Sequence, residues 1–171
     1  PQASLQKRAF NASADKSFPI RSKTRLGSMK QRILIVDGHS MIFASPDLAS
    51  QHANNTANAR DGLIRLLTGL QDATDWTVAV VFDGKGPKAS SEGSPHGIAV
   101  FYSREGQTAD AIIERLAAKY GADFQVTVAT NDRMERTTSE SFGCDSISAT
   151  QLFMEIERAN ESLREKIRRL Q

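Results

Sequence analysis

Two short apolar runs that end in Asp-Gly constrain the fold of this chain more than any other feature. The first run covers residues 33–36 and ends at Asp37, and the second covers residues 77–82 and ends at Asp83. Their length and β-branched content are typical of strands that are buried on both faces. Strands of this kind occur mainly in parallel sheets that helices cover on both sides.

The rest of the chain alternates between strand and helix patterns. Apolar residues recur at helical spacing after Thr56, after Thr108 and after Ser148, and the last two are suitable N-caps. This alternation indicates βαβ units, and we predict an α/β fold of three layers around a mainly parallel central sheet. The predicted strands cover 33–36, 77–82, 98–102 and 124–129, and the predicted helices cover 56–70, 108–120, 132–141 and the segment from 148 onward.

Two segments lack apolar periodicity and are predicted to be loops. The residues before Thr56 form a polar loop that contains Ser45-Pro46-Asp47, and residues 84–97 form a long loop rich in turn-forming residues. Long loops in compact domains are usually functional.

The last predicted helix has one apolar stripe and one charged face. The arginines and lysine near its end suit the negative C-terminal dipole of a helix. We expect the stripe to pack on the domain, and a contact with a partner helix or a second copy is the alternative. The stripe consists of Leu152, Ile156, Ala159, Leu163, Ile167 and Leu170.

Composition narrows the class of protein. A chain of 171 residues with 39% hydrophobic side chains can form one domain with one sizeable core. No apolar run approaches the length of a membrane span, so we expect a soluble protein without a membrane partner. Cys144 is the only cysteine, which excludes an internal disulfide and a cysteine-rich zinc site. A reducing compartment follows, and we expect the cytoplasm.

The first 28 residues differ from the rest in charge. They carry six Lys and Arg against one acid, which leaves 16 basic and 19 acidic residues in the remainder. An Arg- and Ser-rich leader that is poor in acids is typical of an organellar transit peptide. However, Gly27-Ser28-Met29 resembles a cloning junction before a start methionine, and we favour that interpretation. We predict that residues 1–28 are disordered and that residues 29–171 form the domain.

Four aspartates are predicted to meet at one edge of the sheet. Asp37, Asp83 and Asp132 each follow an apolar strand, and ligands of open parallel sheets lie beyond the carboxyl ends of the strands. Asp110 begins a helix that starts at the same edge. Glu114 lies one turn later on the same helix face and extends the cluster.

Carboxylates gathered in this way predict a divalent metal. Like charges that lie close together raise one another's pKa, and a hard cation such as Mg²⁺ or Mn²⁺ removes that repulsion. Such an ion can activate water and stabilise charge on a phosphodiester. The competing interpretation for each aspartate is a turn residue or a helix cap.

Several motifs resemble those of the YacP-like NYN-domain proteins, a family of PIN-like nucleases. The resemblance covers residues 32 to about 170 and keeps the order and spacing of the motifs. These are ILIVDGHSMIF, Ala59-Arg60-Asp61, VVFDG, EGQTADAIIERL, VTVATND and SFG.

The resemblance implies a Rossmann-like three-layer fold, metal-dependent endoribonuclease activity and, in some members, association with the ribosome. RNA, including mRNA on the ribosome, is therefore the expected partner, and Mg²⁺ or Mn²⁺ the expected cofactor. The catalytic and metal-binding acids of the family map onto Asp37, Asp83, Asp110 and Asp132.

The chain departs from the family after the first strand. The family commonly has Asp-Gly-Tyr-Asn there, whereas this chain has Asp-Gly followed by His39 and Ser40. Ser40 offers one hydroxyl in place of an amide for contact with phosphate or water. We expect His39 to replace tyrosine in packing or stacking, and a proton donor or a phosphate contact is the alternative. Thr108 and Thr130 lie beside the acids and are expected to orient ligands or water.

Substrate binding requires positive charge, because acids that hold a metal do not attract a polyanion. The candidate contacts with the RNA backbone are Arg60, Lys85, Lys88, Arg104 and Arg133. Two other functions compete with RNA cleavage. One is a PIN-like RNA- or ribosome-binding module without catalysis. The other is a phosphotransfer domain, but its phosphatase form requires a second acid two residues after Asp37, where this chain has His39.

Overall fold

The structure is a computed structural model and describes residues 30–84 and 97–170. Lys85, Lys88 and nearly all of the loop predicted at 84–97 lie outside these residues, as does the segment 1–28. The strands are β1 (Arg32–Asp37), β2 (Trp76–Phe82), β3 (Ala99–Tyr102), β4 (Gln125–Ala129) and β5 (Asp145–Ile147). The helices are α2 (Gly38–Ala44), α3 (Pro46–Asn54), α4 (Thr56–Ala73), α5 (Ala109–Tyr120), α6 (Arg133–Ser141) and α7 (Ala149–Arg168).

The five strands form one sheet in the order β3-β2-β1-β4-β5, and every pairing is parallel. The chain builds the sheet from β1 through β2 to β3 and then returns to the other side of β1 for β4 and β5. The strand order therefore reverses between β1 and β4. In open α/β sheets, ligands bind in the crevice beyond the carboxyl ends of the strands at such a point.

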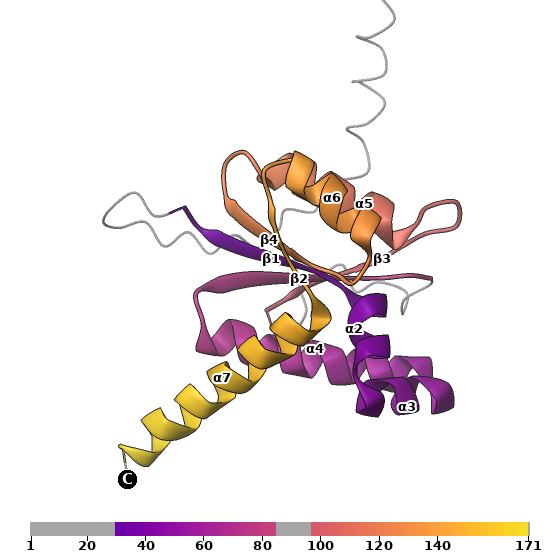
Figure 1. Cartoon of the computed structure of the whole chain (residues 1–171). Coiled ribbons are helices and arrows are strands. Elements are labelled where there is room, and N and C mark those ends of the chain that lie inside the picture. Colours follow the sequence, from indigo (N-terminus) through magenta and orange to yellow (C-terminus); the bar gives the residue numbers. More distant parts are fainter. Residues whose placement is uncertain (1–29, 85–96, 171) are drawn as a thin grey trace, which may run out of the picture.

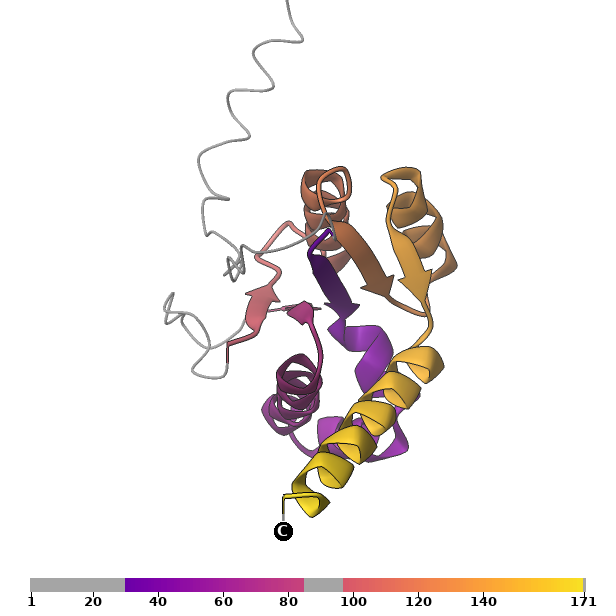
Figure 2. The ribbon, with the colours of Figure 1, turned by 90° about the vertical axis from the view of Figure 1, so that its left-hand side faces the viewer.

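Helices cover both faces of the sheet (Figure 1). α5 and α6 lie on one face, whereas α2, α3, α4 and α7 lie on the other, and the view turned by 90° shows the same division (Figure 2). Two hydrophobic cores result. The larger joins β1 and β2 to α2, α4 and α7, and the smaller joins the opposite faces of β1, β2 and β4 to α5. The predicted three-layer α/β fold is confirmed.

Most predicted elements lie within a few residues of their expected bounds. The four predicted strands are present, and the predicted caps hold as well. The Thr108 hydroxyl accepts a hydrogen bond from the Ala111 amide at 3.2 Å. The Ser148 side chain forms a capping box with Gln151 at the start of α7. These features depend on local pattern, which explains why the sequence reveals them.

The prediction of a polar loop before Thr56 is wrong, because this segment forms the helices α2 and α3. Each helix begins with a side-chain cap, Asp37 for α2 and Ser45 for α3, and Pro46 occupies the first turn of α3. The short helices bury few side chains, so they show no apolar period. The three-residue strand β5 was also missed, since it contains no apolar run.

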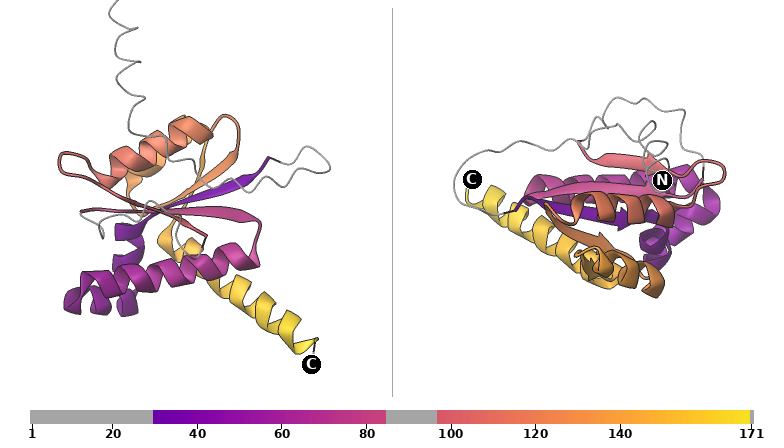
Figure 3. Two further views of the ribbon diagram at one scale, coloured as in Figure 1. Left: turned by 180° about the vertical axis from the view of Figure 1, so that it is seen from behind. Right: turned by 90° about the horizontal axis from the view of Figure 1, so that it is seen from above.

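Only the first part of the apolar stripe of α7 packs on the domain. Leu152, Ile156 and Ala159 are buried, whereas Leu163 and Ile167 are 45% and 50% exposed. The end of α7 projects away from the sheet (Figure 3). Along the described residues, none of the helices combines the length and apolar character needed to span a membrane.

Candidate active site

Asp37 lies at the crevice between β1 and β4 and is 6% exposed. Its Oδ1 accepts hydrogen bonds from the amides of His39 (3.0 Å) and Ser40 (3.2 Å), so it caps α2. Its Oδ2 accepts one from the Thr130 hydroxyl at 2.9 Å. A side chain at Gly38 would place Cβ 2.3 Å from the Phe82 ring, so glycine is required for α2 to begin this close to β2.

Asp83 and Asp132 follow β2 and β4 at the same edge of the sheet. Oδ1 of Asp83 accepts from the Ser103 hydroxyl at 3.2 Å and from the Ala109 amide at 2.9 Å. Oδ1 of Asp132 caps α6 by accepting from the amides of Met134 (2.7 Å) and Glu135 (3.2 Å). In both residues the described part of the chain engages only Oδ1, so Oδ2 can bind a cation or accept a further hydrogen bond.

Asp110 is exposed in the first turn of α5, and partial burial together with the other acids of the cluster raises its pKa. Partial burial is the largest cause that raises its pKa above the ordinary value, and neighbouring negative charges raise the pKa further. In descending order of effect, these charges belong to Asp37, Asp132, Asp83 and Glu114. The predicted aspartates therefore lie close enough to repel one another.

Each of these aspartates except Asp110 also has a structural role, as the competing interpretation stated. Within residues 30–84 and 97–170, the side chains of three or more acids, histidines or cysteines do not converge into a finished metal-ligand set. The carboxylates share one edge of the sheet without meeting at one point.

Glu135 is a further acid of this cluster that is not among the residues predicted from the sequence. It lies on the buried face of α6 and is only 4% exposed. Neither of its carboxylate oxygens has a hydrogen-bond partner in the described residues. Burial is the main cause that raises its pKa to about 8, and the negative charge of Asp37 raises the pKa further. The Thr130 hydroxyl lies near enough to lower the pKa in part, but its single proton is donated to Asp37, so Glu135 does not receive that hydrogen bond.

One signal could have identified Glu135. It lies three residues after Asp132, so the two acids share one face of a helix start, as Asp110 and Glu114 do. Glu114 lies one helical turn after Asp110 in a similar way, and it is exposed in the structure. The polar composition of α6 gives no indication of which side faces the core, so the sequence does not show that Glu135 is buried.

The hydroxyl groups near the acids hold the crevice together. Thr130 is fully buried, and its hydroxyl both donates to Asp37 and accepts from the Asp132 amide at 3.0 Å. The Ser40 hydroxyl lies 3.3 Å from that of Thr130 and accepts from the Asn131 amide at 3.1 Å. Ser40 therefore joins α2 to the end of β4. Thr108 caps α5 beside this edge.

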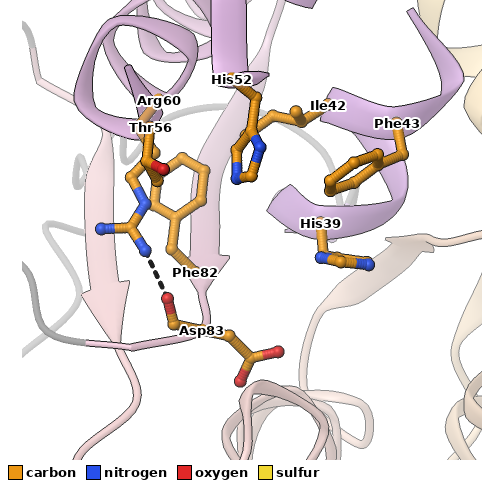
Figure 4. Close-up of a pocket in the computed structure, with 8 residues that line it drawn as sticks. All are labelled: His39, Ile42, Phe43, His52, Thr56, Arg60, Phe82 and Asp83. Atoms are coloured by element: carbon orange, nitrogen blue, oxygen red, sulfur yellow. Dashed lines mark hydrogen bonds between the residues drawn. The ribbon is translucent and has the colours of Figure 1, made fainter. Parts of the chain in front are cut away.

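The predicted substrate contacts divide into two groups. His39 and Arg60 line a hollow beside Asp83 (Figure 4). His39 packs against Phe43 with ring centroids 4.5 Å apart, and Arg60 donates to the backbone carbonyl of Asp83. Arg133 and Arg104 are exposed, the former at the start of α6 and the latter after β3.

The chemistry of the cluster fits a divalent cation. The charged side chains that raise the pKa values of Asp110 and Glu135 are all carboxylates. Mg²⁺ and Mn²⁺ prefer oxygen ligands of this kind. A buried carboxyl group without a hydrogen-bond partner is costly unless it is protonated or paired with a cation. Glu135 is such a group, and a cation would supply the missing partner.

Comparison with known proteins gives one consistent result. The family model described as "YacP-like NYN domain" matches residues 34–171. The Bacillus subtilis (strain 168) protein "Uncharacterized protein YacP" is 35% identical over 140 residues, which cover 81% of this chain and 82% of that protein.

Two crystal structures of Rae1 (YacP) from Bacillus subtilis are similar in fold. One aligns with a TM-score of 0.70 and 35% identity, covering 81% of this chain and 80% of that one. The other, of a point mutant, aligns with a TM-score of 0.69 and 33% identity, covering 81% and 82%.

Proposed function

The chain belongs to the YacP-like NYN-domain family, and from this premise we propose that it is a metal-dependent endoribonuclease. Membership indicates a nuclease, and hydrolysis of RNA phosphodiester bonds, including those of mRNA on the ribosome, is the finer proposal. The observation that carries the metal requirement is Glu135, whose buried carboxyl group lacks a hydrogen-bond partner in the described residues.

The proposed cofactor is Mg²⁺ or Mn²⁺, held at the edge of the sheet between α5 and α6. The proposed ligands are the four aspartates together with Glu135, either directly or through water. Asp110 is exposed and Asp37 is buried, so the site reaches from solvent into the crevice. When bound, the ion offsets the repulsion among the acids and stabilises charge on the phosphate.

The residues of the chain position the reaction. Three hydrogen bonds fix the Asp37 carboxylate, which provides a rigid base for the site. Water attacks the phosphorus in line, the bond to the 3′ oxygen breaks, and that oxygen takes a proton from solvent. The products carry a 5′-phosphate and a 3′-hydroxyl. Arg60 and Arg133 are proposed to contact neighbouring phosphates, since they flank the acidic edge.

A cleavage assay tests this function. Labelled single-stranded RNA is incubated with the protein in Mg²⁺, Mn²⁺ or EDTA, and the product ends are identified. We expect cleavage with either metal and none in EDTA. Asp37→Asn and Asp110→Asn should each reduce the rate about a thousand-fold, because metal-ion catalysis is worth several kcal/mol.

The matched control is Asp72→Asn, an exposed aspartate near the end of α4 and outside the acidic cluster, which should cleave at the wild-type rate. Full cleavage by both Asp37→Asn and Asp110→Asn would contradict the proposal. RNA binding is measured in parallel. Binding without cleavage in any metal would favour an RNA-binding module, for which the engaged hydroxyl of Ser40 is the supporting observation.

A further inference from the structure

A hollow of about 150 Å³ opens beside Asp83, on the side of the sheet that α2, α3 and α4 cover (Figure 4). The acidic cluster uses the side chain of Asp83, whereas the remaining residues of the hollow have no part in the proposed metal site. The hollow is lined by His39, Ile42, Phe43, His52, Thr56, Arg60, Phe82 and Asp83.

Three rings stand together on one wall of the hollow. Phe43 lies between His39 and His52, with ring centroids 4.5 Å and 4.9 Å away. Despite these contacts the Phe43 side chain is 52% exposed, which is unusual for a large aromatic residue. Exposed planar rings beside an acidic site are suited to stacking against another planar group.

The opposite wall carries a positive charge in a fixed position. The guanidinium group of Arg60 lies 5.4 Å from the ring centroids of both Phe82 and Tyr102. It also donates to the backbone carbonyl of Asp83. These contacts limit the motion of a side chain that is otherwise flexible, so its charge stays at the rim of the hollow.

We propose that this hollow binds one nucleobase of single-stranded RNA, next to the phosphodiester that is cleaved. The base stacks on Phe43 and its neighbouring imidazoles, and Arg60 contacts the adjoining backbone phosphate. The inference rests on the proposed function, because Asp83 contributes its side chain to the acidic cluster and its backbone to the hollow. A base can enter only when it is unpaired and unstacked, so duplex RNA is excluded.

The test measures binding rather than cleavage. Fluorescence anisotropy in EDTA compares a short single-stranded RNA with a series in which one abasic residue occupies each position in turn. One position should weaken binding by roughly 5- to 150-fold, the range known for loss of a stacked base. Phe43→Ala should weaken binding of the intact RNA by a similar factor and should leave the RNA that is abasic at that position unchanged.

Controls separate stacking from loss of structure. Phe43→Trp should retain binding, whereas Phe43→Leu, which keeps an apolar side chain on α2, should lose it. Phe142→Ala removes a phenylalanine that is 40% exposed at the end of α6 and should have no effect. Equal binding by the whole abasic series, or equal losses by Phe43→Ala on intact and abasic RNA, would overturn the inference.

The outcome is distinguishable from failure of the proposed function. If the protein binds one base in EDTA but cleaves no RNA in Mn²⁺, the nuclease proposal fails and the base site stands. If the protein cleaves RNA but binds every RNA of the abasic series equally well, the base site fails and the nuclease proposal stands.

Discussion

Asp37 at the start of α2 and Glu135 in the first turn of α6 are equally buried but differ in their hydrogen bonds. The Asp37 carboxylate accepts three hydrogen bonds, from two amides and one hydroxyl. The Glu135 carboxylate accepts none from the described residues. Both carboxyl groups face the same crevice, so their position does not explain why one accepts three hydrogen bonds and the other accepts none from the described residues.

The contrast shows how the two charges are stabilised. The protein itself compensates the charge of Asp37, whereas Glu135 requires a partner from outside, either a proton or a cation. Removing each side chain should therefore change stability in opposite directions in the metal-free protein. Substitutions at four positions test this comparison, from the largest expected effect to the smallest.

Asp37→Ala should lower the free energy of unfolding by about 2–4 kcal/mol, because α2 loses its cap and the buried Thr130 hydroxyl loses its acceptor. Urea denaturation measures the change. Asp37→Asn keeps an oxygen that can cap the helix and should lose less than half as much. Equal losses by the two variants would show that the cap contributes little.

Glu135→Gln should stabilise the metal-free protein at pH 8 by on the order of 1–3 kcal/mol. The folded protein retains the Glu135 proton up to a pKa of about 8, whereas the ordinary pKa of a glutamate is 4.5. The folded state therefore binds more protons between these values, and wild-type stability falls as pH rises through that range. The variant lacks this loss, so thermal unfolding at pH 5 should show little difference.

Manganese provides the second measurement on Glu135. At pH 8, saturating Mn²⁺ should raise the melting temperature of the wild type more than that of Glu135→Gln, because the ion binds the charged carboxylate. An equal rise in both proteins would show that Glu135 does not contribute to the metal site. A variant less stable than the wild type at pH 8 without metal would contradict the comparison itself.

Thr130→Val should destabilise the protein by about 1–2 kcal/mol, since the Asp37 carboxylate and the Asp132 amide both lose their hydroxyl partner. Thr130→Ser keeps the hydroxyl and should recover most of that loss. Chemical denaturation of the two variants provides the measurement. No difference between them would mean that the hydroxyl is not what stabilises Asp37.

Ser40→Ala should have the smallest effect, about 1 kcal/mol or less, because the Asn131 amide loses an acceptor and the Thr130 hydroxyl loses one long contact of 3.3 Å. For a domain of this size the melting temperature should fall by roughly 2–4 °C. Ser40→Asn introduces the residue common in the family and should also increase RNA cleavage if the shorter serine weakens catalysis. An unchanged rate would show that Ser40 is sufficient.

Much of the site follows from local pattern. Asp37, Asp83 and Asp132 end apolar strands, and a parallel sheet brings such ends to one edge whatever the remaining sequence. Asp110 follows from the Thr108 cap, which starts α5 at the same edge. These inferences require only short apolar runs for the strands, helical spacing of apolar residues and a capping residue.

Other features depend on contacts between segments that are distant in the chain. The helices α2 and α3 bury too few side chains to show a period, and β5 is ordered by pairing with β4. The hollow joins residues of α2, α3 and α4 to the end of β2. Neither the spacing nor the composition of these segments indicates that they meet.

The sequence by itself therefore determined which acids reach the edge of the sheet, because position along a strand or helix is a local property. Only the tertiary structure decided how each acid is stabilised there. Burial and hydrogen bonding depend on groups as far apart as Asp37 and Thr130, which lie 93 residues apart in the chain. For that reason the spacing from Asp132 places Glu135 near the cluster, but only the fold shows that its carboxyl group is buried without a hydrogen-bond partner in the described residues.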